Sequence, residues 1–324
     1  MSKYFLGVDV GGTKSHALIT DHSGKIVGFG KAGTGNHEAV GYAGLIDVLN
    51  TTTEAALAQA GITREQIAGA GFGLCGYDWP SERQAHLDAV ATLGLSAPVE
   101  LVNDAVISLI AGAEAGWGIS LVAGTGANCW GRDAQGRHGH VTGFGQIFGE
   151  AGGGSELVQR ALWAIAHHYT LLGPPTVLTE RFMQHYGAQN AEALLEGYTS
   201  GLYRVNAGDA LLVFDAAQAG DAVALDLIRW VGGELGNLAI AVIRQLALHA
   251  HAFDVVLGGN FYRGHRLIIE MLSARILQEA PLARIIRLHA DPVVGGALLG
   301  MEVAGCDPAT IANARRALTR QPAT

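Results

Sequence analysis

The sequence predicts an α/β protein made of two related halves, and three observations support this prediction. Strand-like apolar runs alternate with helical patterns along the 324 residues. The opening pattern of strand, glycine turn and strand returns 112 residues later. Glycine supplies 46 residues, about twice its usual share. We therefore expect two domains of one plan, with tight turns where the backbone comes close to a neighbour.

The first half opens with a predicted three-stranded antiparallel meander. A Gly-Gly-Thr turn follows the first strand, and the polar turn Asp21–Gly24 follows the second. A helix rich in alanine and leucine then ends at Gly61. The elements expected in this half are strands at 4–10, 16–20 and 25–31, a helix at 38–60, a strand at 67–74, a helix from a capping box at 81–84 to Gly94, a strand at 99–102 and a helix at 105–115.

The second half begins where the opening pattern returns. Moving residues 10–25 forward by 112 positions places Gly12 on Gly124 and Thr13 on Thr125. The identities fall on turns, where backbone conformation selects the residue type. The elements expected after this second opening are helices at 155–172, 222–248 and 264–279, a strand at 254–257, an apolar segment at 293–303 and a polar helix at 308–318. We expect domains at 1–118 and 119–324, with a helical insertion near 176–218.

Three glycine turns predict a polyphosphate site. A turn without Cβ atoms lets successive backbone N–H groups point at one anion, and a threonine hydroxyl adds a donor. One such turn is an ordinary hairpin, but two in matching places of a duplicated unit favour a ligand held from both sides. The turns are Gly11–Gly12–Thr13–Lys14, Gly124–Thr125–Gly126 and Gly258–Gly259–Asn260.

Two carboxylates stand at strand ends beside these turns. Asp9 directly precedes the first turn, where it could hold Mg²⁺ together with phosphate oxygens. Asp104 follows the strand at 99–102 and precedes a helix, so a helix cap is its simplest role. Beside three phosphate-type turns, a base that accepts a hydroxyl proton is the better interpretation.

Composition excludes several other functions. The formal net charge is −8, which gives no electrostatic support for nucleic acid or an anionic membrane as partner. Three distant cysteines form neither a disulfide framework nor a CxxC pair, and the N-terminal apolar stretch is too short for a signal peptide. We therefore expect a cytoplasmic protein with a small-molecule substrate, and a homodimer stays open.

Two nucleotide-binding motifs match only in part. Gly7–Lys14 lacks the Gly-Lys-Ser/Thr order of a P-loop, and a strand follows it instead of a helix. Gly71–Gly76 has the spacing GxGxxG, but its glycines lie inside a predicted strand and Tyr-Asp-Trp-Pro follows. A P-loop fold and a dinucleotide-dependent oxidoreductase are therefore disfavoured.

The three turns resemble the phosphate and adenosine motifs of the actin, hexokinase and Hsp70 superfamily. Within it, the chain most resembles the N-acetylglucosamine kinases grouped with the BadF/BadG-type ATPases. The matching stretches are Leu6–Ser15, Val122–Cys129 and Val256–Asn260, together with Asn103–Ala105. The resemblance implies two ribonuclease-H-like domains of the actin-like ATPase type, with ATP and Mg²⁺ in an interdomain cleft. In that fold the terminal helix can return to the first domain, which concerns residues 306–324 here.

The resemblance also implies residue roles. Asp104 falls on the catalytic base, and the activity implied is phosphoryl transfer to the 6-hydroxyl of N-acetylglucosamine or a related hexosamine. Asn36 and His37 match a sugar-binding stretch, and Gly76 lies in a loop that reads Leu-Ser-Gly in the family and Leu-Cys-Gly here. A further stretch, with Phe144, Gly145 and Glu150, matches another part of the sugar site.

This last stretch departs from the family pattern. Phe144 stands where a tryptophan is usual, Glu150 replaces an aspartate, and Ala151 replaces a glutamate. The indole N–H is lost and the carboxylate is moved by one methylene. A preference for the N-acetyl group is thus not implied, and glucosamine or another hexose stays an alternative acceptor. A regulatory ATPase without any sugar acceptor is the second alternative.

Overall fold

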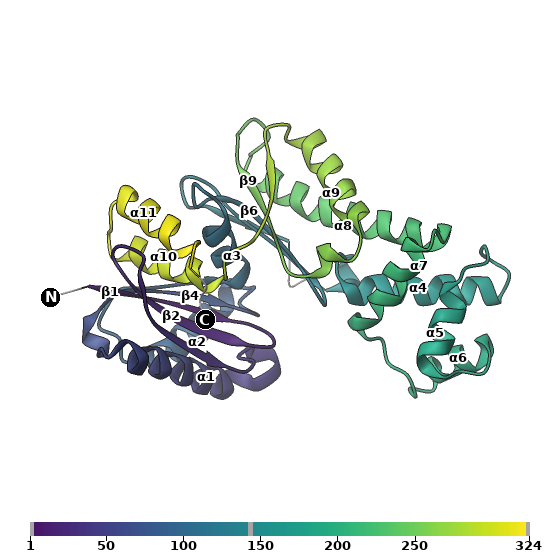
Figure 1. Ribbon diagram of the computed structural model, residues 1–324, viewed down its shortest axis with the longest axis horizontal. Coiled ribbons are helices and arrows are strands. Elements are labelled where there is room, and N and C mark those ends of the chain that lie inside the picture. The colour runs from purple at the N-terminus through teal and green to yellow at the C-terminus, as the bar shows by residue number, and fades with distance from the viewer. Residues whose placement is uncertain (1–2, 142–144, 322–324) are drawn as a thin grey trace.

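The computed structural model describes residues 3–141 and 145–321. Two five-stranded mixed sheets form its two lobes, and helices cover both faces of each sheet (Figure 1). The sheets have one topology, in which an antiparallel meander is extended by two parallel strands. The prediction of an α/β chain with a duplicated plan is confirmed.

The first sheet has the strand order β3-β2-β1-β4-β5. β1 pairs antiparallel with β2 and parallel with β4, and β5 extends the sheet beyond β4. The meander therefore has the predicted form, and no end of a strand in this sheet differs from its expected position by more than one residue. Their bounds are β1 Tyr4–Val10, β2 Ser15–Asp21, β3 Ile26–Ala32, β4 Ile67–Leu74 and β5 Val99–Asn103.

Two helices accompany one face of this sheet. α1 (His37–Ala60) buries Leu45 and Leu49 against the sheet and ends at Gly61, whose φ of 64° is the left-handed cap expected from the sequence. α2 (Arg83–Ala91) starts later than predicted. The expected capping box at 81–84 does not form, and a short 3-10 turn, Pro80–Glu82, precedes the helix instead. Glu82 in this turn accepts hydrogen bonds from the backbone N–H groups of Asp78 and Trp79.

The second sheet repeats the first in the order β10-β9-β6-β7-β8. β6 corresponds to β1, and the shift of 112 residues places the meander where the sequence repeat predicted it. β10 was not foreseen, because it is a four-residue edge strand without a long apolar run. The bounds are β6 Gly118–Ala123, β7 Ala127–Arg132, β8 His138–His140, β9 Asp254–Gly258 and β10 Arg284–Arg287.

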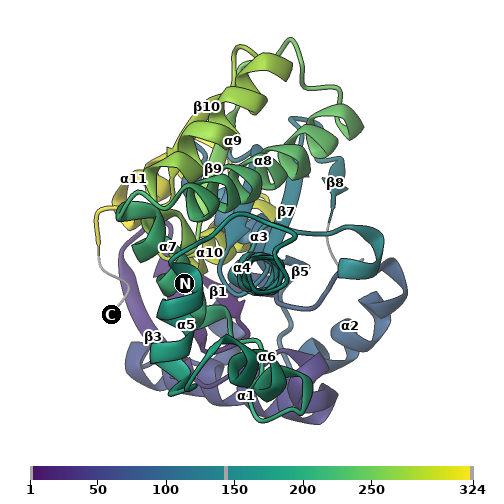
Figure 2. The ribbon, with the colours of Figure 1, turned by 90° about the vertical axis from the view of Figure 1, so that its right-hand side faces the viewer.

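Helices of the second lobe cover the outer face of this sheet, and those between residues 154 and 199 extend away from the first lobe (Figure 1), toward the viewer in Figure 2. α8 lies along the sheet and packs against α9 and α7. The segment expected as a helical insertion contains α5, α6 and α7. The helices are α4 Gly154–Tyr169, α5 Leu178–Tyr186, α6 Ala191–Thr199, α7 Ala210–Gln218, α8 Ala222–Gln245 and α9 Arg266–Glu279.

Two helices fill the space between the sheets. α3 (Asp104–Gly112) packs its Ile107 against the first lobe and its Leu109 against Val256 of the second. α10 (Val293–Val303) lies beside it on β1 and β4. The chain therefore returns to the first sheet from residue 293, earlier than the 306 we expected, and α11 (Pro308–Leu318) follows α10 there (Figure 1).

Glycines explain how closely α10 approaches the sheet. A Cβ atom on Gly71 would lie 2.3 Å from the backbone oxygen of Gly296, and one on Gly69 would lie 2.2 Å from that of Gly300. The GxGxxG-like run in β4 is thus a helix-packing surface. In the described ranges, no helix is long and apolar enough to cross a membrane.

Candidate functional site

The site lies where the carboxyl ends of β1 and β5 approach the start of β7. Asp9 is the penultimate residue of β1, and Asp104 is the first residue of α3, directly after β5. Both side chains are half-buried. Since β1, β4 and β5 run parallel, their ends bring these carboxylates to one edge of the sheet.

Asp104 is not the cap of its helix. The side-chain oxygen of Asn103 accepts the N–H of Ala105 at 2.9 Å and caps α3 instead. The Asp104 carboxylate accepts a hydrogen bond from Asn128 Nδ2 at 3.3 Å and one from the thiol of Cys75. Burial raises its pKa to about 6, against the lowering effect of the backbone N–H groups of Ala105 and Asp104 and of these two side-chain donors. This carboxylate is therefore available to accept a proton near neutral pH.

The pKa of Asp9 is strongly raised. Burial raises its pKa to about 8, and the nearby carboxylates of Asp104 and Asp291 add to this effect, while Lys14 opposes it. A cation beside Asp9 would relieve this repulsion. Among residues 3–141 and 145–321, no group of three or more His, Cys, Asp and Glu side chains could hold a metal on its own. A metal here would thus need oxygen ligands from a bound molecule, as Mg²⁺ on a nucleotide has.

Asn103 and Asn128 link the two lobes at the site. Asn128, from β7, donates to Asn103 Oδ1 at 2.9 Å, and Asn103 Nδ2 donates to Asp78 Oδ1 at 2.9 Å. Asn128 Oδ1 is buried and has no hydrogen-bond partner in the described part of the chain. Sequence reasoning missed Asp78 and gave Asn128 no role. Asp78 follows β4, so its place at a parallel strand's carboxyl end could have revealed it.

The residues expected to bind sugar are brought together. Gly76 has a φ of 81°, and a Cβ there would lie 2.6 Å from Asn36 Oδ1 and 3.1 Å from His37 Nδ1. Asn36 caps α1 by accepting the N–H of Glu38 at 3.0 Å. Only glycine therefore allows the loop after β4 to lie against the start of α1.

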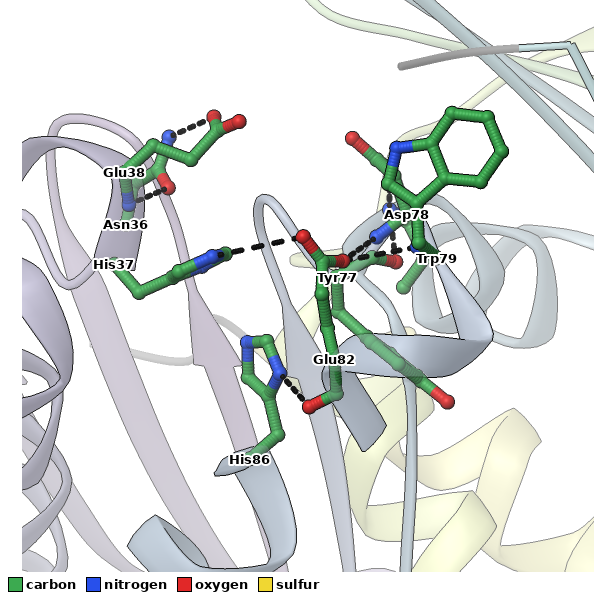
Figure 3. A network of polar contacts seen from close by, with 9 residues as sticks. Asn36, His37, Glu38, Tyr77, Asp78, Trp79, Glu82 and His86 are labelled. Carbon is green, nitrogen blue, oxygen red and sulfur yellow. Dashed lines mark hydrogen bonds and ion pairs between the residues drawn. The ribbon is translucent and has the colours of Figure 1, made fainter. Parts of the chain in front are cut away.

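Glu82 holds this loop in place (Figure 3). Its Oε2 accepts the N–H groups of Asp78 and Trp79 at 3.0 and 2.9 Å, and its Oε1 lies 3.8 Å from His37 Nε2. The ring of His37 also meets His86 edge to face, with centroids 4.8 Å apart. The geometry of the loop after β4 thus depends on a carboxylate that the sequence did not single out.

A cavity of about 320 Å³ lies between the lobes at this point, and we call it the cleft cavity. Glu38 and Asp78 line it from the first lobe, and Gly126, Gly145 and Glu150 line it from the second. Glu150 Oε2 accepts the N–H of Gly145 at 2.8 Å. Phe144 lies outside the described residues.

The glycine turns border the same region. A Cβ atom on Gly12 would lie 4.0 Å from the Sγ of Cys75. The Cys75 thiol in turn donates a hydrogen bond to Asp104. In the second turn, Gly124 and Gly126 are exposed, two to four residues before Asn128. The backbone N–H groups of Gly154 and Ser155, at the start of α4, donate to the backbone oxygens of Gly124 and Thr125 and hold this turn against the helix.

The third turn lies against the second. Gly259 has a φ of 88°, and a Cβ there would be 2.1 Å from the backbone oxygen of Ala123. Asn260 beside it is exposed, and Gly258 is buried. In the first turn, Gly12, Thr13 and Lys14 are exposed as well. The first two turns thus follow the corresponding strands β1 and β6, and the third lies at the end of β9, which runs parallel to β6.

Comparison with known proteins decides the family. The model of the BadF/BadG/BcrA/BcrD ATPase family matches residues 6–300. The chain belongs to this family. This BadF-family chain is 24% identical over 299 residues to an N-acetylmuramic acid/N-acetylglucosamine kinase of Clostridium acetobutylicum, covering 92% of the chain and 98% of that protein. It is 25% identical over 315 residues to an N-acetyl-D-glucosamine kinase of Dictyostelium discoideum, covering 93% and 99%.

Solved structures confirm the fold of this BadF-family chain. A proposed N-acetylglucosamine kinase of Chromobacterium violaceum has a TM-score of 0.68 and 24% identity, covering 92% of the chain and 99% of its own. A ROK family glucokinase of Streptomyces griseus has a TM-score of 0.54 and 19% identity, with coverages of 92% and 99%. The predicted two-domain actin-like ATPase fold is thus confirmed.

Proposed function

We propose that this protein is an ATP-dependent sugar kinase that transfers a phosphoryl group to the 6-hydroxyl of N-acetylglucosamine or a related hexosamine. The observation that carries the proposal is the position of Asp104, a carboxylate freed from helix capping and joined to Asn128 of the opposite lobe. The family and the kinases among the relatives support it.

Each candidate residue has a role in this proposed reaction. Asp104 accepts the hydroxyl proton, because it is half-buried at the cleft and has a pKa of about 6. Gly145 and Glu150, which line the cleft cavity, bind the sugar from the second lobe. Asn36, His37 and Gly76 bind it from the first lobe, beside the lining residue Glu38, and Phe144 is assigned to the sugar site from the sequence alone. The first two glycine turns hold the phosphates, and Gly258, Gly259 and Asn260 admit the adenosine.

Asp9 is the residue that would hold Mg²⁺. Burial, and after it the neighbouring carboxylates of Asp104 and Asp291, raise the pKa of Asp9, so a divalent cation would stabilise its charged form, and hard oxygen donors suit this ion. The metal would screen the charge on the phosphate oxygens. Lys14 approaches Asp9 closely enough to lower its pKa and supplies a second positive charge beside the first turn.

A panel of hexoses and amino sugars with Mg-ATP tests the proposal directly. We expect ADP release to depend on the acceptor, and product analysis to place the phosphate on the 6-hydroxyl. Hydrolysis of ATP that no sugar stimulates would favour the regulatory ATPase instead.

The charge of the cleft cavity predicts a preference among acceptors. Four carboxylates line it, and within the described residues no Lys, Arg or His does; the four are Glu38, Asp78, Glu150 and Glu156. The lactyl carboxylate of N-acetylmuramic acid would meet like charges there. We expect its kcat/KM to be about tenfold or more below that of N-acetylglucosamine. Steady-state kinetics with both sugars check this, and equal values would contradict the charge argument.

The pH profile gives a second check. Asp104 must be deprotonated to accept a proton, and its pKa is about 6. We therefore expect kcat/KM to be low at acidic pH, to rise through about pH 6 and to level off above it. The profile is measured with saturating Mg-ATP. A rate that is flat between pH 5 and 7, roughly the range that brackets this pKa, would exclude Asp104 as the titrating base.

A further inference from the structure

A second cavity lies between the lobes, on another part of their interface from the glycine turns. It has a volume of about 280 Å³, and we call it the rear cavity. The edge strand β5 of the first sheet forms one wall, and β7 and β8 of the second sheet form the other. Side chains of α3 and α10, among them Val106, Ile110 and Leu299, form an apolar floor.

The polar groups of this cavity are mainly donors. Arg83 and Arg132 line it, with Glu100 as the one carboxylate among the lining residues the structure describes. Arg83 Nη2 donates to Glu100 at 3.2 Å, and Arg132 Nη2 donates to Glu302, outside the lining, at 2.9 Å. A guanidinium can donate several hydrogen bonds at once, so each can serve a ligand as well. Each guanidinium group is thus paired with one carboxylate, and its remaining N–H groups are the donors that the cavity offers to a ligand.

Trp130 supplies an independent sign of a ligand. It lines the rear cavity and is only 7% exposed, and its ring stacks on His140 with centroids 4.3 Å apart. Its Nε1 is buried and has no hydrogen-bond partner among residues 3–141 and 145–321. An indole N–H can only donate, and a buried donor without a partner is costly. The missing partner must therefore be an acceptor.

We propose that the rear cavity binds a small oxyanion, a phosphate or carboxylate group carried on a compact body. Two guanidinium groups and the Trp130 N–H supply the donors, and the apolar floor receives the body of the ligand. The volume is near the lower end of ligand pockets, about 300 Å³, so it suits a small metabolite and not a nucleotide.

The rear cavity is connected to the catalytic cleft. Asn103 lines the rear cavity, and its Nδ2 donates to Asp78, which lines the cleft cavity. Asn103 also accepts from Asn128 of the second lobe. A bound oxyanion would thus touch the polar bridge that joins the lobes, while the cleft on the other side of that bridge carries negative charge.

The indole signals of the five tryptophans provide the test. The ¹⁵N-labelled protein is kept saturated with Mg²⁺ and a non-hydrolysable ATP analogue, so that the phosphate turns are occupied, and is titrated with inorganic phosphate and, separately, with acetate. Trp130→Phe assigns the Trp130 signal. We expect this signal to move saturably with one or both probes, and the one that binds more tightly identifies the oxyanion.

Two variants separate the cavity from general charge effects. Arg132→Gln should weaken binding about tenfold or more, because it removes a charged donor. Arg137→Gln is the matched control, because Arg137 lies in the same β7–β8 hairpin, is 65% exposed and does not line the cavity. The proposal is overturned if neither probe moves the Trp130 signal, if sodium chloride at equal ionic strength moves it equally, or if both variants weaken binding alike. The other four indole signals report that each variant is folded.

Discussion

Asp104→Asn is expected to lower kcat for sugar phosphorylation by about 100-fold or more, which is the usual contribution of a general base. The amide keeps the shape of the side chain and can still accept the hydrogen bond of Asn128, but it cannot take a proton. Asp104 lies at the start of α3 and not in a glycine turn, so the affinity for nucleotide should change only a few-fold. Kinetics and equilibrium binding of an ATP analogue measure the two effects separately.

Asp226→Asn is the matched control for this variant. Asp226 lies on the outer helix α8, its side chain is 75% exposed, and its partner is Arg229 three residues later. Its loss should leave kcat unchanged, since exposed ion pairs of this kind contribute little. If Asp104→Asn kept turnover within about tenfold of the unaltered protein, a different group would have to accept the proton.

The elements and the three turns could be predicted because they depend on local chemistry. Glycine and threonine at matching turns revealed the duplication, and apolar periodicity placed the long helices. β10 could not be predicted, because it is four residues long and only the neighbouring β9 makes it a strand. The return of α10 to the first sheet depends likewise on contacts between residues about 230 to 290 positions apart in the chain.

The site was predicted in part for a similar reason. Asp9 lies at the end of β1, and Asp104 and the glycine turns lie at or directly after strand ends, so a strand-end rule finds them. Asp78 and Asn128 take part through side-chain bonds across the two lobes, with Asn103 between them. Such a network depends on how the sheets face each other, which no local pattern encodes. The sequence alone could not decide whether Asn103 or Asp104 caps α3, because Asn and Asp both cap helices well. In the structure, Asn103 is the cap.

The glycines of β4 lead to the largest expected effect on stability. Gly71→Ala would place a Cβ 2.3 Å from the backbone oxygen of Gly296 and 2.7 Å from the Cβ of Leu299. α10 cannot simply move away, because on its other side Gly295 meets α3 so closely that a Cβ there would be 1.8 Å from the backbone oxygen of Ile107. We expect Gly71→Ala to lower the free energy of unfolding by about 3 kcal/mol or more.

Gly33→Ala is the control that separates packing from the loss of a glycine. A Cβ on Gly33 would meet no atom of the described residues within 4 Å, and its backbone is not left-handed. Its unfolding free energy should stay within about 1 kcal/mol of the unaltered protein. Equilibrium denaturation in urea measures both variants. If Gly71→Ala were as stable as Gly33→Ala, α10 would have room to shift between the sheets, and the layer it forms with α3 could not be the rigid support from which Asp104 projects.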